Sequence, residues 1–361
     1  MISPMKKLAS HLLLAGVTFS SIALAGEKPM GRTEVQPAAQ PQLAAGQNGE
    51  VWLAYGHAEE ILVRRSSDGG ENFDAPIKVA TLPSLALGMR RGPRIAAHAE
   101  HVTITAIGNE LVSFHSGDGG RTWSTAVTIN EVAASAREGL HDLAMAPDGR
   151  LFVTWLDLRE GAMMVCGAES VDHGRTWSKN ESIYRSPDKS VCECCHPSAM
   201  FDAQGNLAVM WRNSITGSRD LWMATRAAGA RDFSAARKLG EGTWKIAGCP
   251  MDGGRIVALG GGQFGSVWQR AGEIYFAADR GPEVLLGRGK QPIAVARDGK
   301  VFACWQDGPD LVSAQVGQGA PVKHASNARF AAALALPGGR LLVAYEQAAQ
   351  TNPSGIVIER W

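Results

Sequence analysis

One short unit recurs along this sequence, and its spacing constrains the fold more than any other feature. Each copy reads as an apolar strand, a turn that often contains Asp-Gly, and a second apolar strand ending in an aromatic residue. Clear copies cover 41–55, 141–155, 196–211, 292–305 and 330–345, and weaker copies begin at Pro93 and Cys249. Successive copies begin 38 to 55 residues apart, close to the roughly 40 to 50 residues of a four-stranded propeller blade. We therefore predict an all-β propeller with seven blades, with six blades as the alternative.

The pattern within each copy favours strands and also predicts the core. Residues alternate with a period of two in 51–53 and 151–153, as in a half-buried strand. The aromatic residues that end the second strands should pack between blades; they are Tyr55, Trp155, Trp211, Trp305 and Tyr345. The final copy has room for three strands, so residues 32–39 are expected to add its outer strand and close the ring. Cys166 and Cys304 lie within strand patterns and are predicted to be buried free thiols.

A second motif follows the third strand of several predicted blades. Residues 116–123 and 170–177 are full copies of S-x-D-x-G-x-T-W, and 66–73 is a slightly decayed copy. The motif resembles the Asp-box of the sialidase-type (BNR-repeat) propellers, and this resemblance covers essentially the whole chain after the first 25 residues. In such a turn the Asp and Ser side chains bond the loop's own N–H groups, Gly adopts a positive φ and Trp packs beneath. We therefore predict a structural role for Asp68, Asp118 and Asp172.

Residues 1–25 have the features of a cleaved secretory signal. A basic start precedes an apolar run from Leu12 to Leu24, and Ala23-Leu24-Ala25 offers the small residues that a signal peptidase reads. We expect a single propeller domain over 26–361 and a periplasmic or secreted location. The formal net charge is +1 and no basic stripe occurs, so nucleic acid is not an expected partner. No later segment is long and apolar enough to predict a membrane helix.

The most unusual chemistry lies in residues 192–196, which read Cys-Glu-Cys-Cys-His. Half of the six cysteines of the chain are in this segment, although a packed core needs no such cluster. In a propeller, the loops that lead into the innermost strands share one face near the central axis. Three consecutive loops of this kind should carry the candidate metal ligands, which are Cys192, Cys194, Cys195, His196, Cys249, Met251 and His141.

Four interpretations of this cluster are open from the sequence alone. One is a disulfide between Cys249 and one of the three clustered cysteines, which suits an oxidising compartment. The second is a soft-metal site, because thiolates with nearby His or Met select Cu(I) or Zn(II); copper is preferred, with zinc as the alternative. The third is covalent haem c at C-x-x-C-H, which is disfavoured because Pro197 and a pinned loop leave little room for a porphyrin. The fourth is thiol–disulfide exchange through Cys192 and Cys195.

The surrounding sequence is also similar to a particular group of proteins. C-E-C-C followed by R-N-S-x(4)-R-D-L-W at 212–222 and W-K-I-A-G-C-P at 244–250 resembles a subgroup of exported sialidase-like proteins. Sialidase activity, as the resemblance implies, requires three arginines on the substrate carboxylate, a Tyr nucleophile paired with Glu, and an Asp. The sequence motif that carries the first of these arginines in sialidases is not found before residues 66–73. The one adjacent Tyr/Glu pair, Tyr345-Glu346, lies at a position of the repeat that is expected to face the core. The sequence therefore leaves open whether the chain is an enzyme.

The leading hypothesis is an exported sialidase-like propeller that binds a soft metal through its Cys/His cluster and takes part in metal handling. A glycoside hydrolase of exo-sialidase type acting on acidic sugars is the alternative, and a disulfide-stapled interaction scaffold is a third class. For the sugar alternative, the residues expected to face the channel are Arg94, Asp142, Arg212 and Asp220. The expected partners are a metal ion, a small molecule or a glycan, and the sequence identifies no protein partner.

Overall fold

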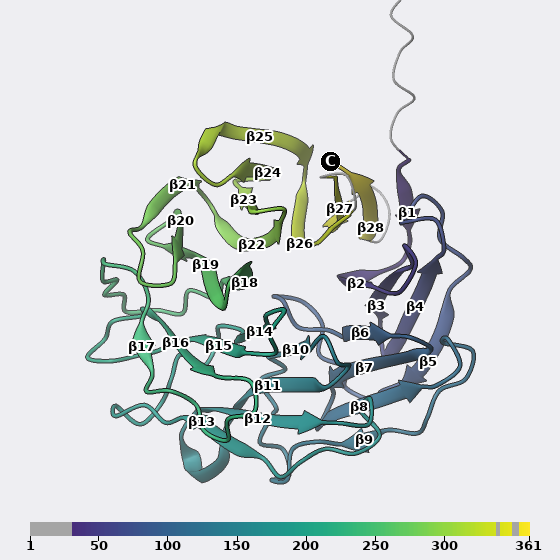
Figure 1. Cartoon of the computed structure of the whole chain (residues 1–361), viewed down its shortest axis with the longest axis horizontal. Helices are drawn as coiled ribbons and strands as arrows, with labels where there is room; N and C mark the ends of the chain where they lie inside the picture. The colour runs from purple at the N-terminus through teal and green to yellow at the C-terminus, as the bar shows by residue number, and fades with distance from the viewer. Residues whose placement is uncertain (1–30, 337–339, 349–353) are drawn as a thin grey trace, which may run out of the picture. The chain divides into compact units, whose positions relative to one another are not determined.

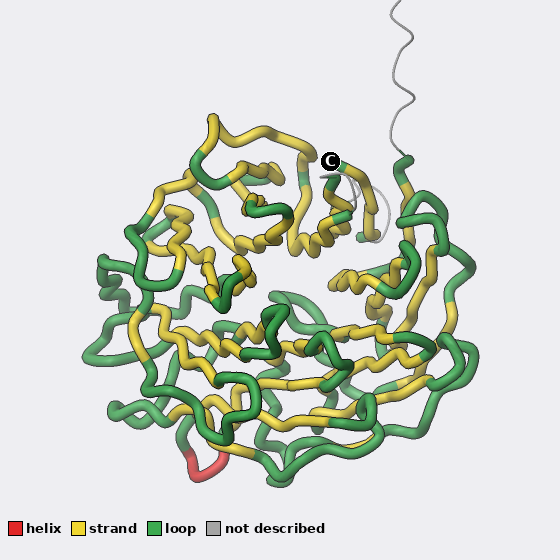
Figure 2. Tube along the Cα trace, in the orientation of Figure 1, coloured by secondary structure: helices red, strands yellow, loops and turns green. Residues whose placement is uncertain are grey.

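The period-two alternation is realised as seven antiparallel sheets of four strands each, arranged around one axis within residues 31–361 (Figure 1). The computed structural model describes residues 31–336, 340–348 and 354–361, so the predicted signal segment lies outside the described residues. The seven-bladed all-β propeller is confirmed, and the six-bladed alternative is wrong. In the described ranges the one helical element is the 3-10 turn η1 (Arg159–Gly161), beside strands and loops (Figure 2). Those ranges contain no helix with the length and apolar character that crossing a membrane requires.

Each of the first six blades consists of four consecutive strands, ordered from the axis outward. Blade 1 consists of β2 (Ala39–Ala45), β3 (Val51–His57), β4 (Glu60–Ser66) and β5 (Ile77–Thr81). Blade 2 consists of β6 (Arg94–His98), β7 (His101–Ile107), β8 (Leu111–Ser116) and β9 (Val127–Thr128). Blade 3 consists of β10 (His141–Met145), β11 (Leu151–Asp157), β12 (Met164–Ser170) and β13 (Glu181–Tyr184). Blade 4 consists of β14 (Ser198–Phe201), β15 (Leu207–Arg212), β16 (Leu221–Arg226) and β17 (Arg237–Lys238). Blade 5 consists of β18 (Arg255–Gly260), β19 (Gln263–Arg270), β20 (Glu273–Ala278) and β21 (Val284–Arg288). Blade 6 consists of β22 (Lys290–Arg297), β23 (Lys300–Asp307), β24 (Asp310–Gln315) and β25 (Gln318–Ser326).

The seventh blade is built from both parts of the chain and closes the ring. Its strands are β26 (Ala328–Ala335), β27 (Leu341–Gln347), β28 (Gly355–Arg360) and, on the outside, β1 (Thr33–Val35). β1 pairs antiparallel with β28, so that Thr33 lies opposite Ile358 and Val35 opposite Ile356. The prediction that residues 32–39 supply the missing outer strand is confirmed. This pairing covers an edge that would otherwise expose a row of unpaired backbone groups.

The core lies between neighbouring blades, and the predicted aromatic residues form part of it. Trp155 is fully buried among side chains of blades 2 and 3, and Trp211 among those of blades 3 and 4. Tyr55, Trp305 and Tyr345 are also buried, as predicted. Each large apolar side chain removed from water in this way stabilises the fold by about 1.5 to 3 kcal/mol. The buried thiols of Cys166 and Cys304 are free, in agreement with the prediction.

The Asp-box turns after β4, β8 and β12 hold themselves together by side-chain hydrogen bonds. In the second copy the Ser116 hydroxyl donates to Asp118 at 2.8 Å and accepts from the Gly120 N–H at 2.8 Å. The same carboxylate accepts from the Thr122 N–H and hydroxyl at 2.9 and 2.6 Å. Gly120 has a φ of +79°, and a Cβ there would lie 2.6 Å from the Trp52 ring. The carboxylates of Asp68, Asp118 and Asp172 are thus engaged within their own turns.

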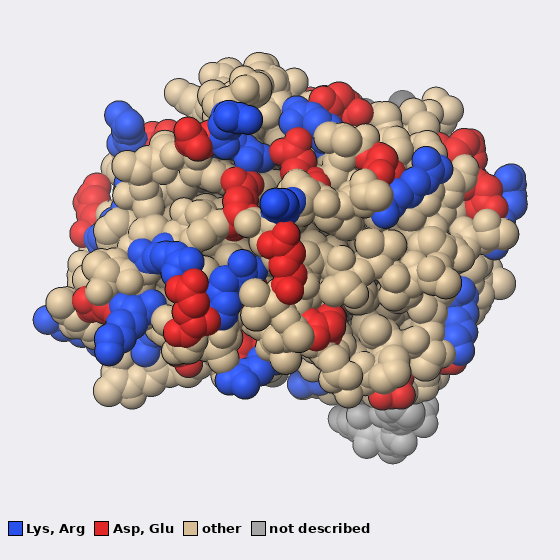
Figure 3. All heavy atoms as spheres, turned by 90° about the horizontal axis from the view of Figure 1, so that it is seen from below, with Lys and Arg blue, Asp and Glu red and all other residues tan. Residues whose placement is uncertain are grey.

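Acidic and basic side chains are mixed on the face of the molecule seen in Figure 3. Neither sign forms a continuous stripe on that face. Elsewhere in the described residues, ion pairs join neighbouring blades, such as Arg226 of blade 4 with Glu169 and Glu181 of blade 3.

Candidate functional site: a cysteine cluster beside the axial pocket

Three loops on one face of the ring surround the predicted cysteine cluster. They are residues 185–197 before β14, 213–220 between β15 and β16, and 239–254 before β18. Backbone hydrogen bonds tie these loops together: the Cys192 N–H donates to the Arg212 carbonyl at 2.9 Å, and the Arg219 N–H to the Trp244 carbonyl at 2.8 Å. The Asp252 N–H donates to the Cys195 sulfur at 3.3 Å. The cluster is therefore held by three loops, all of which adjoin blade 4.

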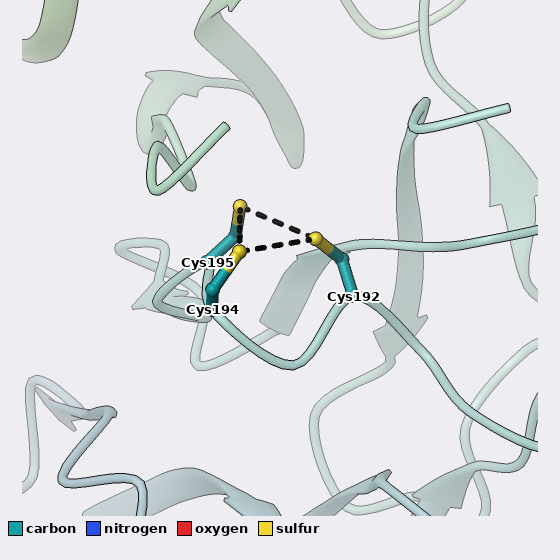
Figure 4. A group of neighbouring side chains, drawn as sticks. All are labelled: Cys192, Cys194 and Cys195. Carbon is teal, nitrogen blue, oxygen red and sulfur yellow. Dashed lines mark hydrogen bonds between the residues drawn. The ribbon is translucent and has the colours of Figure 1, made fainter. Parts of the chain in front are cut away.

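The sulfur atoms of the cluster converge on one point (Figure 4). The Sγ atom of Cys192 lies 3.7 Å from that of Cys194 and 3.5 Å from that of Cys195, and the latter two are 3.9 Å apart. Cys194 is joined to Cys249 by a disulfide, with a Cα–Cα distance of 6.3 Å. Cys192 and Cys195 are free and buried, Cys194 is half-buried, and Cys249 is exposed. Four of the six cysteines thus meet at one place.

The two free thiols differ in acidity because their surroundings differ. The hydrogen bond between Cys192 and Cys195 lowers the pKa of Cys192 to about 6, assisted by the nearby Arg219 and Arg212 guanidinium groups. Burial raises the pKa of Cys195 above its usual range, and the hydrogen bond to Cys192 adds to that effect. Cys192 is therefore the more acidic thiol of the pair.

The other predicted ligands lie elsewhere. The His196 ring lines the axial pocket described below, with Nε2 3.0 Å from the Gly254 carbonyl, and it is absent from the group of sulfur atoms. His141 is fully buried, with Nε2 3.1 Å from the Thr105 hydroxyl and Nδ1 without a partner. Met251 has a φ of +55°, and its carbonyl accepts a hydrogen bond from Gln291. Among the described residues, the group of His, Cys, Asp and Glu ligand atoms within 4.8 Å of one another consists of Cys192, Cys194 and Cys195.

Beside the cluster, an axial pocket of about 410 Å³ runs between the innermost strands of all seven blades. Its apolar wall comes mainly from β22 and β26, and its charged end is formed by Arg90, Arg94, Asp142, His196 and Arg255. Arg255 donates to the Asp142 carboxylate at 2.8 Å, and Arg94 lies 3.7 Å from the same carboxylate. Burial, followed by the three arginines, holds the pKa of His196 well below its usual range, so this imidazole is neutral. The charged end therefore has more cationic than anionic groups.

The sequence placed four residues at the channel, and only two of them line it. Arg94 and Asp142 do, whereas Arg212 and Asp220 lie outside the axial pocket, among the loops around the cysteines. The buried Arg212 guanidinium donates to the carbonyls of Asp252, Arg219 and Gln269, at 2.9, 2.6 and 2.8 Å respectively. Asp220 accepts from the Trp244 N–H at 2.8 Å. The expected position of these two residues at the channel is therefore wrong, and their polar atoms instead hold the loops around the cysteines.

Two arginines of the axial pocket were missed from the sequence. Arg255 is the first residue of β18, as Arg94 is the first residue of β6, so the shared position within the blade was a usable signal. Arg90 lies in the loop before β6, and its guanidinium donates to Gln291 and to the carbonyl of Ala331. No strand pattern marks that position.

The adjacent Tyr/Glu pair of the sequence is part of the core. The Tyr345 ring is fully buried, and burial raises the pKa of its hydroxyl above the usual range. The Glu346 carboxylate accepts from the backbone and side-chain nitrogens of Gln40 at 2.8 Å and pairs with Arg329. Neither residue lines the axial pocket. The sequence predicted that this pair belongs to the core, and its position in the structure agrees with that prediction.

Four histidines gather at the far end of blade 2. β6 begins with Arg94 at the axial pocket and ends with His98, near His101, His115 and His173. His101 stacks on His173 with ring centroids 4.0 Å apart, and its Nδ1 lies 3.2 Å from Nε2 of His115. Burial lowers the pKa of His115 to about 4, and the nearby Arg175, His101 and His173 act in the same direction.

This histidine cluster predicts a pH dependence of stability. Below about pH 6.5 the unfolded chain takes up a proton on His115 that the folded chain accepts only near pH 4. The free energy of unfolding should therefore be fully retained above pH 6.5 and fall as the pH is lowered toward 4. We expect His115→Gln to reduce this slope, measured by urea unfolding at several pH values. An unchanged slope in the variant would contradict the assignment.

Known structures share this architecture at low sequence identity. No family model and no curated protein matches the chain in sequence. Polysaccharide lyase Uly1 is 8% identical, with a TM-score of 0.56 over 94% of each chain. YCF48 from Cyanidioschyzon merolae is 14% identical, with a TM-score of 0.53 over 91% of this chain and 98% of that chain. A K499G mutant of the NanB sialidase from Streptococcus pneumoniae is 11% identical, with a TM-score of 0.47 over 92% of this chain and 71% of that chain.

At such identities the likeness to known structures establishes the fold alone. The fold is a seven-bladed β-propeller of four-stranded blades with three Asp-box turns. A group of four cysteines lies beside its axial pocket.

Proposed function

We propose that this propeller binds a soft metal ion through its clustered cysteines and takes part in metal handling, in the periplasm or outside the cell. Copper is the preferred ion and zinc is the alternative. The observation that carries the proposal is the convergence of the Cys192, Cys194 and Cys195 sulfur atoms within 3.5 to 3.9 Å of one another.

These sulfur separations fit a thiolate metal site. Thiolates bind zinc at about 2.3 Å, so two of them on a tetrahedral ion lie about 3.8 Å apart. The three separations at the cluster bracket that value. Cys249 supplies the fourth thiolate once its bond to Cys194 is reduced. The resulting ligand set is Cys192, Cys194, Cys195 and Cys249, and His196, His141 and Met251 leave the set expected from the sequence.

The surroundings of the cluster favour exchange of the ion over permanent burial. The lining of a surface pocket of about 620 Å³ includes Cys192, Cys194, Cys249, Glu193 and Arg219. Three of the four ligands therefore line this pocket, with Cys192 only 1% exposed, while the buried Cys195 is not part of its lining. The Arg212 and Arg219 guanidinium groups partly offset the negative charge of the thiolates. An ion held in this way is accessible to a donor or acceptor, as metal handling requires.

The test is metal analysis on the mature protein after reduction under inert gas and dialysis against Cu(I) or Zn(II). We expect about one bound equivalent, with thiolate-to-copper absorption in the ultraviolet for the copper form. The Cys192→Ser/Cys195→Ser variant should lose the metal. Cys166→Ser/Cys304→Ser removes two buried thiols outside the cluster and should retain it. Metal retained by the first variant, or absent from the reduced wild-type protein, would overturn the proposal, and a Soret band would indicate haem.

A second candidate function is the binding or hydrolysis of an acidic sugar in the axial pocket. It is favoured by the three arginines that line the charged end of that pocket, two of which, Arg94 and Arg255, pair with its Asp142 carboxylate. Arg255 is the group to replace, because Arg94 donates to the carbonyls of Gly92, Pro93 and Arg90, whereas Arg255 makes its contact with Asp142.

For this candidate we expect Arg255→Ala to weaken the binding of sialic acid, measured by calorimetry, and to remove any hydrolysis of a fluorogenic sialoside. Arg288→Ala, at an exposed position on β21, is the control. Equal behaviour of both variants and the wild-type protein would exclude the axial pocket as an acidic-sugar site. If the metal test also fails, a disulfide-stapled scaffold is what remains.

A further inference from the structure

Two pairs of cysteines in different redox states lie in contact at the cluster. Cys194 and Cys249 form a closed disulfide, whereas Cys192 and Cys195 are free. We propose that this is a thiol–disulfide exchange centre, in which the buried dithiol of Cys192 and Cys195 opens the surface disulfide and so moves two reducing equivalents to the exterior. The proposal uses the cysteines of the metal site but does not require a metal.

The first step is an attack on the disulfide from inside the protein. Exchange proceeds by attack of a thiolate on a disulfide sulfur through a mixed disulfide. The Sγ atom of Cys192 lies 3.7 Å from that of Cys194. As the Cys192–Cys194 bond forms, the Cys194–Cys249 bond breaks, and Cys249 leaves with the electron pair and takes a proton from water. Because Cys249 is exposed, its departing thiolate is solvated at once.

The second step passes the disulfide to the buried pair. The Sγ atom of Cys195 is 3.5 Å from that of Cys192, the shortest separation in the cluster. Cys195 gives its proton to the hydroxide left by the first step and attacks Cys192; a Cys192–Cys195 bond forms, and Cys194 leaves as a thiolate that is then protonated by water. The two residues have the C-x-x-C spacing of thiol–disulfide oxidoreductases. The net change is an isomerisation that consumes no oxidant and no reductant.

Burial gives the exchange a direction in space. Cys192 and Cys195 are each only 1% exposed, although Cys192 also borders the surface pocket, so an external disulfide meets Cys194 and Cys249 first. Cys194 and Cys249 line the surface pocket of about 620 Å³. After the exchange, the surface pair can reduce an organic disulfide in solution or on another protein. Two thiols of that disulfide are released, and Cys194–Cys249 closes again while Cys192–Cys195 stays closed.

The test is irreversible alkylation of the native, metal-free protein with iodoacetamide, followed by peptide mapping. In the structure every free cysteine of the described residues is buried, so a static molecule would react slowly and at no surface position. With exchange, the label accumulates on Cys194 and Cys249, and a Cys192–Cys195 disulfide appears. Label on Cys192 or Cys195 instead would show direct opening of the cluster and overturn the proposal. An unlabelled protein with Cys194–Cys249 intact would also overturn it.

Two variants separate the steps. Cys195→Ser permits the first step and blocks the second, so label is expected on Cys249 and not on Cys194. Cys166→Ser, which removes a buried thiol on β12, should label as the wild-type protein does. Label on both Cys194 and Cys249 in the Cys195→Ser protein would contradict the proposed order. The metal proposal is judged separately on the reduced protein, so either proposal can fail while the other stands.

Discussion

Replacing Arg212 with methionine is expected to lower the free energy of unfolding by about 3 to 5 kcal/mol. The guanidinium is 1% exposed and donates to three backbone carbonyls, those of Asp252, Arg219 and Gln269. A buried carbonyl left without its donor costs about 1 to 3 kcal/mol. Methionine retains much of the volume of the arginine stem, so the loss is mainly one of hydrogen bonds. The measurement is urea unfolding followed by tryptophan fluorescence.

The matched control for this experiment is Arg297→Met. Arg297 lies at the end of β22, where it pairs with the exposed Asp298 at 3.3 Å. Surface ion pairs of this kind contribute about 0 to 1 kcal/mol, so this variant should remain close to the wild-type protein. If the free energy of unfolding falls by a similar amount in both variants, the hydrogen bonds of Arg212 do not stabilise the loops around the cysteines.

The second large effect is expected from Gly253→Ala. A Cβ atom at this position would lie 1.8 Å from the carbonyl oxygen of His196, which is a backbone atom that no side-chain rotation can move. Residues 249–253 must therefore shift away from 195–196. We expect a loss of about 3 kcal/mol or more in the free energy of unfolding, because overpacking against backbone is hard to relax. The shift should also separate Cys249 from Cys194.

Gly248→Ala tests whether this effect is specific to the close approach. Gly248 is in the same loop, next to Cys249, and its added Cβ would meet only Ile246 at 3.7 Å, an ordinary contact. We expect this variant to retain both the stability and the Cys194–Cys249 pairing, read by peptide mapping without reduction. Gly253→Ala should lose the pairing in a large part of the population. Intact pairing and stability in Gly253→Ala would contradict the contact with His196.

The fold was predictable because its repeating unit is local. Residues 141–155, for example, form the hairpin of β10 and β11, in which His141 lies opposite Trp155. Hydrophobic alternation, turn residues and the final aromatic all act within such a hairpin. The number of blades then follows from the number of copies. Even the closing strand could be inferred, because the last copy lacked a partner for its outer edge.

The candidate site was predictable in position but not in composition. Cys195 and His196 are adjacent, but Cys195 ends the turn at 193–195 and His196 follows it. The Cys195 sulfur accepts from the Asp252 N–H, whereas the His196 ring lines the axial pocket. The repeat starting at Cys249 also placed its first strand too early, because β18 begins at Arg255. Loop conformations of this kind depend on contacts with other blades, which no local pattern reports.

The closure between β1 and β28 has a consequence for how the chain acquires its structure. Hairpins within blades join residues close in sequence and form early, whereas the contact of Val35 with Ile356 spans nearly the whole chain. Bringing such distant segments together carries the largest loop-closure entropy, so the ring is completed last. A growing chain can assemble its first six blades in order as they emerge. Until the final strand is synthesised, however, the first strand has no neighbour, and the circle stays open.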